Sequence, residues 1–295
     1  GSGGRLEFSG QASGGMARVV LNAGSDTASG GTLDLSGVNV WLPVGSIEGG
    51  GNVSLGSKSL IVVGNGHATT FSGVIGGSVP AAFPSLAVLG GTLTLTGANT
   101  YAGRTQVGDG VNADSGKLVA ANTSGSATGS GAVVVERGGT LGGGGFIDGP
   151  VTLRDGGTLA PGDPVTLTLQ SSLTWDGFGL IRLVLGADDA GSDHLVVESL
   201  VRGASGPFVF ELIDAGIVGG TTYSLLQFNS LIGFVASDFA IFGAGVAGNF
   251  SLVDGAIAFT AAMPEPPAAA LFMLGLLGIA WFVRRSRAQP ARDMH

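Results

Sequence analysis

The chain lacks most of the residues on which enzyme chemistry depends. It contains no cysteine and three histidines, His67, His194 and His295, and charged residues make up only 12% of its 295 residues. Without cysteine there is no disulfide and no thiol nucleophile, and the histidines are too far apart for a zinc-binding pattern. None of them accompanies a serine in a Gly-x-Ser-x-Gly context. We therefore predict no catalytic residue, no metal and no cofactor, and expect His67 to be an exposed turn residue.

The little charge that is present is acidic. The formal net charge is −8 at neutral pH. Binding to DNA or RNA requires a basic surface that neutralises phosphates, so we expect no nucleic-acid partner. An acidic surface instead suits a secreted protein that must stay soluble.

Glycine is the residue in excess, with 56 copies, nearly three times its usual share of ~7%. The glycines have no Gly-X-Y period, which excludes collagen. The many Val, Leu, Ile and Thr residues between them exclude a disordered linker. Glycine-rich turns that separate strands of β-branched and leucine residues are typical of an all-β protein.

A short phrase of two glycines and an alternating strand recurs along the chain. Its copies begin at Gly30, Gly90, Gly138 and Gly156. In the second copy Leu93 and Leu95 face one side of the strand, and the intervening threonines face the other. One such strand cannot bury its leucines, whereas stacked coils can, with glycines supplying the positive φ that corners need. We therefore predict an all-β fold, with a β-solenoid of stacked coils over residues 1–175.

Residues 176–260 are less repetitive and richer in phenylalanine. Alternating runs at 207–213 and 256–260 predict strands there. A stack of coils needs its open end covered, because an exposed end invites edge-to-edge growth. We therefore predict that this region forms terminal coils or a C-terminal β cap.

The second copy of the phrase carries a resemblance. Residues 90–107 read Gly-Gly-Thr-Leu-Thr-Leu-Thr-Gly-Ala-Asn-Thr-Tyr-Ala-Gly-Arg-Thr-Gln-Val and resemble the autotransporter-associated β-strand repeat. Residues 71–77 and 157–163 resemble the segments that often precede and follow that repeat. The resemblance implies a right-handed parallel β-helix at the cell surface.

The end of the chain has a different composition. A Pro-Glu-Pro triplet at 264–266 is followed by an uncharged apolar run over 268–283 and then by arginines. At ~1.5 Å per residue the run forms a helix of roughly 24 Å, somewhat short of the ~30 Å bilayer core. Arginines resist translocation and stay on the cytoplasmic side. We therefore predict that residues 261–295 contain one short hydrophobic helix that stops in the membrane, with the preceding residues exported.

This order of elements resembles the PEP-CTERM sorting signal of Gram-negative bacteria. The matching residues are Pro264, Glu265, Pro266, Arg284, Arg285 and Arg287. The resemblance implies a partner, an exosortase, which is an integral-membrane protease-transpeptidase, with the helix in the inner membrane before processing. Carriers of the signal are typically exported proteins of strains that make extracellular polysaccharide. The first fifteen residues resemble no signal peptide, so we expect that a leader has been removed or that the chain is a fragment.

One acidic cluster is a candidate catalytic or calcium site. It comprises Asp188, Asp189 and Asp193 beside His194, with Arg182 and Arg202 as the nearest basic residues in sequence. Paired carboxylates can bind calcium or act as acid and base in glycoside cleavage. A solvated loop between two strands is the favoured interpretation.

Other motifs are weaker. Residues 243–248 match Gly-x-Gly-x-x-Gly, but we expect strands on both sides of them, where a dinucleotide site needs a helix on one side. Trp41, Trp175 and Tyr101 are the candidate aromatics for sugar stacking, and we expect two of them to pack in the core or cap.

Three hypotheses for function follow. The favoured one is an exported, non-catalytic, adhesin-like solenoid of the cell surface or extracellular matrix. The second is a polysaccharide-binding or polysaccharide-degrading β-helix enzyme, which for catalysis would need two or three carboxylates within ~5–10 Å in a groove. The third is a plain anchored protein that no exosortase processes.

Overall fold

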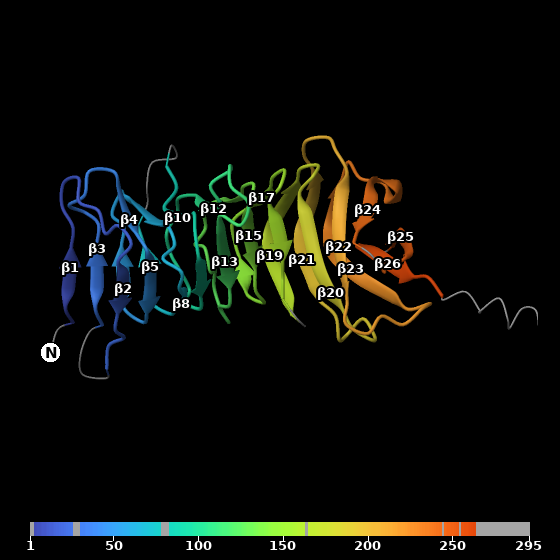
Figure 1. The fold of residues 1–295 in the computed structure, drawn as a ribbon, viewed down its shortest axis with the longest axis horizontal. Helices are drawn as coiled ribbons and strands as arrows, with labels where there is room; N and C mark the ends of the chain where they lie inside the picture. Colours follow the sequence, from blue (N-terminus) through green and yellow to red (C-terminus); the bar gives the residue numbers. More distant parts are fainter. Residues whose placement is uncertain are drawn as a thin grey trace, which may run out of the picture. The chain divides into compact units, whose positions relative to one another are not determined.

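Alternating apolar and polar residues form short strands along most of the chain (Figure 1). The computed structural model describes residues 3–25, 30–77, 83–162, 165–243, 245–253 and 255–263. Within these residues the regular structure is strand apart from one 3-10 turn, η1 (Ala236–Asp238), and it includes no α-helix. The prediction of an all-β fold is therefore confirmed. The hydrophobic helix predicted over 268–283 lies outside the described residues.

The strands of the described residues form three sheets, of four, twelve and ten strands. The four-stranded sheet has the order β1 (Arg5–Glu7), β3 (Thr32–Asp34), β6 (Asn52–Ser54), β9 (Ile75–Gly76). The twelve-stranded sheet has the order β25 (Gly248–Val253), β26 (Ala256–Ala261), β23 (Thr222–Ile232), β21 (His194–Arg202), β19 (Thr166–Trp175), β17 (Val151–Leu153), β14 (Val133–Val135), β12 (Thr105–Val107), β10 (Leu86–Val88), β7 (Ser59–Val62), β4 (Trp41–Val44), with β16 (Phe146–Ile147) beside β19. The ten-stranded sheet has the order β2 (Arg18–Leu21), β5 (Ser46–Gly49), β8 (Ala68–Phe71), β11 (Thr92–Leu95), β13 (Gly116–Ala120), β15 (Gly139–Gly142), β18 (Thr158–Ala160), β20 (Leu180–Leu185), β22 (Phe208–Asp214), β24 (Phe239–Phe242).

Each passage of the chain through the sheets, here called a coil, adds one strand to each sheet that it crosses, except that β16 and β17 of one coil both join the twelve-stranded sheet. For example, β3, β4 and β5 make one coil, and β6, β7 and β8 make the next. Among the described strands every pairing is parallel except those of β26, which runs antiparallel to β23 and β25. In β11, Thr92 lies opposite Ala68 of the preceding coil and Lys117 of the following one. Parallel strands stacked in this way are consistent with a β-solenoid.

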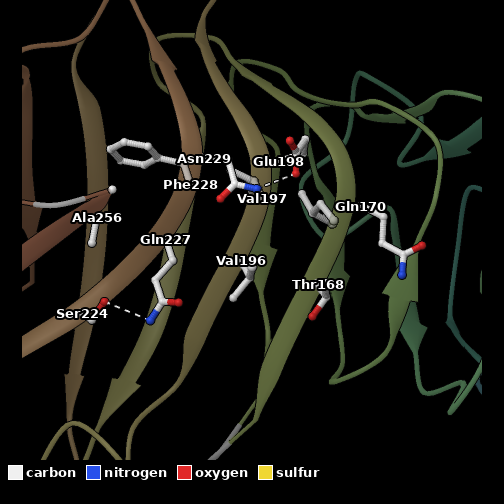
Figure 2. Close-up of a pocket in the computed structure, with 12 residues that line it drawn as sticks. Thr168, Gln170, Val196, Val197, Glu198, Ser224, Gln227, Phe228, Asn229 and Ala256 are labelled. Carbon is white, nitrogen blue, oxygen red and sulfur yellow. Dashed lines mark hydrogen bonds between the residues drawn. The ribbon is translucent and has the colours of Figure 1, made fainter.

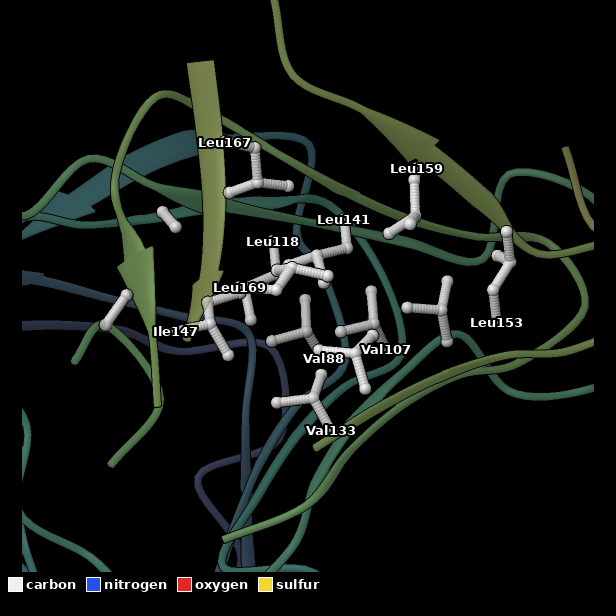
Figure 3. Close-up of a cluster of buried hydrophobic side chains, with 14 of the residues drawn as sticks. Val88, Val107, Leu118, Val133, Leu141, Ile147, Leu153, Leu159, Leu167 and Leu169 are labelled. Atoms are coloured by element: carbon white, nitrogen blue, oxygen red, sulfur yellow. The ribbon is translucent and has the colours of Figure 1, made fainter. Parts of the chain in front are cut away.

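The core is built from rows of similar apolar side chains, one from each coil (Figure 3). A row in the ten-stranded sheet comprises Leu93, Leu118, Leu141 and Leu159. A row in the twelve-stranded sheet comprises Val44, Val62, Val88, Val107, Val135 and Leu153. All of these side chains are buried, and each contributes roughly 1.5–3 kcal/mol by leaving water. The predicted inward stacking of leucines is therefore confirmed.

Glycine is required where the coils turn from the twelve-stranded to the ten-stranded sheet. A Cβ atom on Gly116 would lie 2.3 Å from the backbone oxygen of Val88, and one on Gly139 would lie 2.2 Å from that of Val107. A larger residue would have to push the preceding coil away. The other glycine of the repeated phrase, Gly138, has a φ of +76°, which side chains rarely adopt. The predicted positive φ thus occurs at Gly138, whereas Gly139 allows the backbone of the preceding coil to approach closely.

Buried polar side chains join the coils where the four-stranded sheet ends at β9. Asn99 is 5% exposed, and its Oδ1 accepts a hydrogen bond from the N–H of Ile75 at 2.7 Å. Its Nδ2 donates to the backbone oxygen of Ala127 at 2.6 Å. The hydroxyl groups of Tyr101 and Thr105 lie 2.7 Å apart in the core, and burial raises the pKa of the tyrosine. These contacts hold the chain together where the strand ladder stops.

The C-terminal coils have an aromatic core in place of the aliphatic rows. Trp175 lies opposite Leu153 in register, so it continues the valine row with a much larger side chain. Its ring contacts Phe208 and Phe210 edge-on, with centroids 5.4 and 5.2 Å apart. The indole N–H donates to the backbone oxygen of Gly179 at 2.9 Å. The antiparallel hairpin β25–β26 then extends the twelve-stranded sheet beyond β23.

The predicted domain ranges can be placed on this arrangement. The unit Gly1–Ala261 encloses both predicted β regions, 1–175 and 176–260, and the second unit is Ala262–His295. β19 ends at Trp175 and pairs with β17 and β21, so one sheet continues across that position. The boundary between a solenoid and a cap stays a prediction.

Candidate functional sites

The residues predicted to carry the sorting signal lie outside the described part of the chain. They are Pro264, Glu265, Pro266, Arg284, Arg285 and Arg287. Within the described ranges no helix is long and apolar enough to cross a membrane. The sorting signal and the membrane helix therefore stay predictions.

The loop between β20 and β21 carries most of the predicted acidic cluster. Asp188 accepts a hydrogen bond from the N–H of Gly191 at 2.8 Å, which closes a tight turn. Asp189 accepts one from the N–H of Ser224, one coil further on, at 2.6 Å. The same Asp189 oxygen lies 3.3 Å from Nε2 of His194. One carboxylate thus stabilises its own loop, and the other joins two coils.

Asp193 is the buried member of the cluster, with 2% of its surface exposed. Its two oxygens accept hydrogen bonds from the N–H groups of Val165, at 3.2 Å, and Val184, at 2.9 Å. A buried carboxylate needs such donors, because an uncompensated charge in the interior is strongly destabilising. Asp193 therefore links the segment before β19 to β20 and β21.

The two basic residues near this cluster in sequence pair with other carboxylates. Nε of Arg182 donates to Glu211 at 2.6 Å. Arg202 lies 2.6 Å from Asp238, whose pKa is held below its usual value mainly by the N–H of Val235 and then by Arg202. Among the described residues, no group of three or more His, Asp or Glu side chains is placed to hold a metal ion.

A first hollow, of about 590 Å³, lies over the ten-stranded sheet. Charged residues of both signs line it, namely Asp114, Lys117, Arg182 and Asp193. Asp193 is the member of the acidic cluster that reaches this hollow, and its oxygens already accept two backbone hydrogen bonds. The hollow therefore brings Asp193 of the acidic cluster and its predicted basic partner Arg182 to the same surface. Both residues already bond to other groups of the protein.

A second hollow, of about 520 Å³, follows a bend in the twelve-stranded sheet (Figure 2). The bend lies in β19, where the register with β21 shifts between Leu169 and Ser172. Polar side chains from successive coils project there. Glu198 accepts a hydrogen bond from Nδ2 of Asn229 at 2.7 Å, and Gln170 lies on the neighbouring strand. Gln227 also donates to the hydroxyl of Ser224 at 3.3 Å, so this surface is rich in hydrogen-bonding groups and two pairs of them bond to one another.

A third hollow, of about 380 Å³, lies beside Trp41 at the edge of the twelve-stranded sheet. Its lining residues are Gly10, Gln11, Ala12, Ser13, Asn39, Val40, Trp41 and Pro43. Trp41 is 50% exposed, and the ring of Phe83 stands 6.2 Å from it between centroids, at 56°. An aromatic surface is thus flanked by uncharged amide and hydroxyl groups.

The aromatic residues proposed for sugar stacking are divided as expected. Trp175 and Tyr101 are fully buried, so the prediction that two of the three pack inside is confirmed. Trp41 is the exposed one. His67 lies exposed between β7 and β8, as predicted for a turn residue.

Asn99 is a residue whose structural role the sequence did not reveal. It belongs to the Asn-Thr-Tyr end of the repeated phrase, which suggested a family resemblance and no contact. A small amide inside an apolar repeat, where an alternating strand would place Leu or Val, is a signal for a buried hydrogen-bond bridge.

No protein-family model matches this chain, and no curated protein matches it. The resemblances to the autotransporter-associated repeat and to the PEP-CTERM signal therefore rest on the residues quoted above and stay predictions.

Proposed function

We propose that this protein is an exported, non-catalytic, adhesin-like β-solenoid of the cell surface or extracellular matrix, sorted by an exosortase-type system. In this proposal the solenoid is a right-handed parallel β-helix with a C-terminal β cap, followed by one short hydrophobic helix. The observation that carries it is the order of the tail, with Pro-Glu-Pro at 264–266, an apolar run and then arginines, directly after a long β unit.

The parallel ladders support the solenoid part of the proposal. Rows of aliphatic residues join successive coils through the middle of the stack, so the stack extends by repetition. Such a structure suits a surface spacer or adhesin, because it presents long faces to a partner. The hairpin β25–β26 supports the cap, since its antiparallel pairing interrupts the parallel stack.

The contacts of the acidic cluster support a non-catalytic role. Asp188, Asp189 and Asp193 each accept hydrogen bonds from backbone N–H groups, and Arg182 bonds to Glu211. Acid–base cleavage of a glycoside needs carboxyl groups free to exchange protons with the substrate.

Polysaccharide binding is the alternative function, and the exposed Trp41 beside an uncharged hollow favours it. A polysaccharide-degrading enzyme on the same scaffold would use the hollow that Asp114 and Asp193 line together with Arg182. If the wild-type chain cleaves a polysaccharide and Asp114→Asn does not, the degrading enzyme is supported over a protein that only binds polysaccharide.

Intact-mass spectrometry tests the sorting proposal. The chain is expressed in a Gram-negative host that has an exosortase, and the mature protein is isolated from the envelope and the medium. We expect the wild-type chain to end near Pro266, because the apolar run is short for a permanent anchor. Replacing Pro264, Glu265 and Pro266 with alanine should leave the tail attached and hold the protein at the inner membrane.

A matched variant controls for general damage to the tail. Gln289→Ala together with Pro290→Ala changes residues beyond the arginines, and its processing should equal that of the wild type. If the Pro-Glu-Pro variant and the wild type have the same mass and location, the protein is not sorted in this way and a plain anchor is the better interpretation.

A further inference from the structure

We propose that the hollow beside Trp41 is a binding site for a neutral sugar unit of a polysaccharide. The choice of ligand class rests on the proposed extracellular role. The site itself does not depend on processing of the tail.

The aromatic part of the site is an exposed pair, with Trp41 on the edge strand β4 and Phe83 shortly before β10. Trp41 begins β4, and its side chain points away from the core row that Leu42 and Val44 join. Trp41 and Phe83 are 50% and 42% exposed, and the rings are tilted by 56°. The other described tryptophan and tyrosine side chains are all fully buried. Two neighbouring aromatic rings left in water are unusual on a soluble surface and typical of a binding site.

The polar part of the site is held by the backbone. The segment from Gly10 runs beside β4, where the N–H of Asn39 donates to the oxygen of Gly10 at 2.8 Å, and that of Gly14 donates to the oxygen of Pro43 at 2.9 Å. Nζ of Lys58 donates to the backbone oxygen of Asn39 at 2.8 Å. The backbone around the hollow is therefore fixed in advance of binding, which lowers the entropy cost of association.

The side-chain amides at this hollow are available to a ligand. Gln11 and Asn39 are exposed, and neither amide group makes a hydrogen bond to another described residue. Each amide offers both donors and an acceptor, as sugar hydroxyls require. The neighbouring hydroxyl of Ser13 accepts a hydrogen bond from the N–H of Gly15 at 3.0 Å and can still donate.

The combination matches a sugar better than the other ligand classes. A pyranose ring has one face of C–H groups, which packs on an aromatic ring, and a rim of hydroxyl groups, which bond to amides. The residues that line the hollow carry no charge, and the nearby Lys58 ammonium already bonds to the backbone of Asn39, so the site favours a neutral ligand over an anionic one. Single-stranded nucleic acid also stacks on aromatic rings but needs a basic groove, and this chain has a net charge of −8.

Binding of defined oligosaccharides to the full chain tests the site. The probes are cellohexaose, maltohexaose and a β-1,4-mannohexaose, measured by titration calorimetry and by tryptophan fluorescence. We expect at least one of them to bind, with Trp41→Ala weakening its Kd about tenfold or more and Trp41→Phe weakening it less. Asn39→Ala should cause a smaller loss, since it removes hydrogen bonds and leaves the stacking surface.

Phe242→Ala is the matched control, because Phe242 is 63% exposed on β24, away from the hollow. It should bind like the wild type, and circular dichroism should show that every variant is folded. The proposal is overturned if none of the three probes binds at ~10 mM, or if Trp41→Ala binds as the wild type does. It is also overturned if Trp41→Ala abolishes self-association in sedimentation while no sugar binds, since the aromatic pair would then join two copies of the chain. The unprocessed chain is used throughout, so failure of the tail to be sorted would leave these results unchanged.

Discussion

The middle of the stack and its C-terminal end use the same inward row with different side chains. Between β4 and β14 the row in the twelve-stranded sheet is made of valines, whereas at β19 Trp175 stands in register with Leu153. The ten-stranded sheet changes in the same direction, because Phe210 lies opposite Ile181. The row is continuous, and only the volume that it must fill has changed.

The coils of these two regions also differ in length. In the ten-stranded sheet Thr140 pairs with Thr158, 18 positions further on, whereas Val209 pairs with Ala240, 31 positions further on. A longer coil encloses a wider cross-section. Since protein interiors are filled to the density of organic crystals, the wider coils need aromatic rings where narrow coils need valine. In these two regions the larger side chains thus accompany the longer coils.

The largest expected effect comes from replacing Trp175 of the long C-terminal coils with an aliphatic side chain of the kind that fills the shorter coils in the middle of the stack. Trp175→Leu should lower the free energy of unfolding by about 2–4 kcal/mol, because leucine leaves a cavity among Phe208 and Phe210 and the bond to Gly179 is lost. Urea unfolding followed by circular dichroism measures the change. Trp41→Leu, at a half-exposed position, should cost about 0.5 kcal/mol or less. If Trp175→Leu also lowered the free energy of unfolding by only about 0.5 kcal/mol, the C-terminal coils would not require an aromatic side chain at this position.

A smaller effect is expected from the corners of the narrow coils. Gly139→Ala should destabilise the protein by about 1–3 kcal/mol, since its Cβ would lie 2.2 Å from the backbone oxygen of Val107 and would force two coils apart. The same urea titration detects it. Gly4→Ala is the control, because a Cβ there meets nothing within 4 Å. If Gly139→Ala were as stable as Gly4→Ala, the corner at Gly139 could accept a Cβ atom and the close approach of the coils would not require glycine.

The smallest expected effect is on the pH dependence of stability, to which one aspartate turn in each region should contribute in the same direction. In the middle, the N–H of Val111, followed by the side chain and N–H of Asn112, lowers the pKa of Asp109 to about 2. At the wide end, the N–H groups of Gly216 and Ile217 hold the pKa of Asp214 below its usual value. Both folded pKa values lie below the unfolded value of about 3.9, so the stabilisation is present above that pH and is lost as the pH falls toward 2.

Unfolding measured from pH 5 to pH 2 tests this. The free energy of unfolding should fall with pH in the wild type, and Asp109→Asn and Asp214→Asn should each make the fall less steep. If only one of the two variants changed the pH dependence, the two regions would differ in their turns as well as in their cores.

Much of the fold could be predicted from the residues that repeat. The alternation at Leu93 and Leu95 predicted strands with a buried side, and the structure buries both side chains. The glycine pairs predicted the corners. The coil lengths could not be predicted, because the copies of the phrase do not fall on one sheet. The copy at Gly30 forms β3 of the four-stranded sheet, whereas the copy at Gly90 forms β11 of the ten-stranded sheet.

The candidate sites were less predictable than the fold. Asp188, Asp189 and Asp193 are close together in sequence, which suggested a joint site, yet each bonds to a backbone N–H in a different segment. Which carboxylate bonds to which coil depends on the register between strands many residues apart. The exposure of Trp41 likewise depends on β4 lying at the edge of its sheet.

The sequence by itself determined the all-β class, the inward rows and the need for glycine, because these follow from local alternation and backbone sterics. It also contains the tail pattern on which the sorting proposal rests. Only the tertiary structure decided which polar groups are free. Parallel stacking brings residues about 18 to 31 positions apart into contact, so the partners of a side chain are set by coil length and register rather than by its neighbours in the chain.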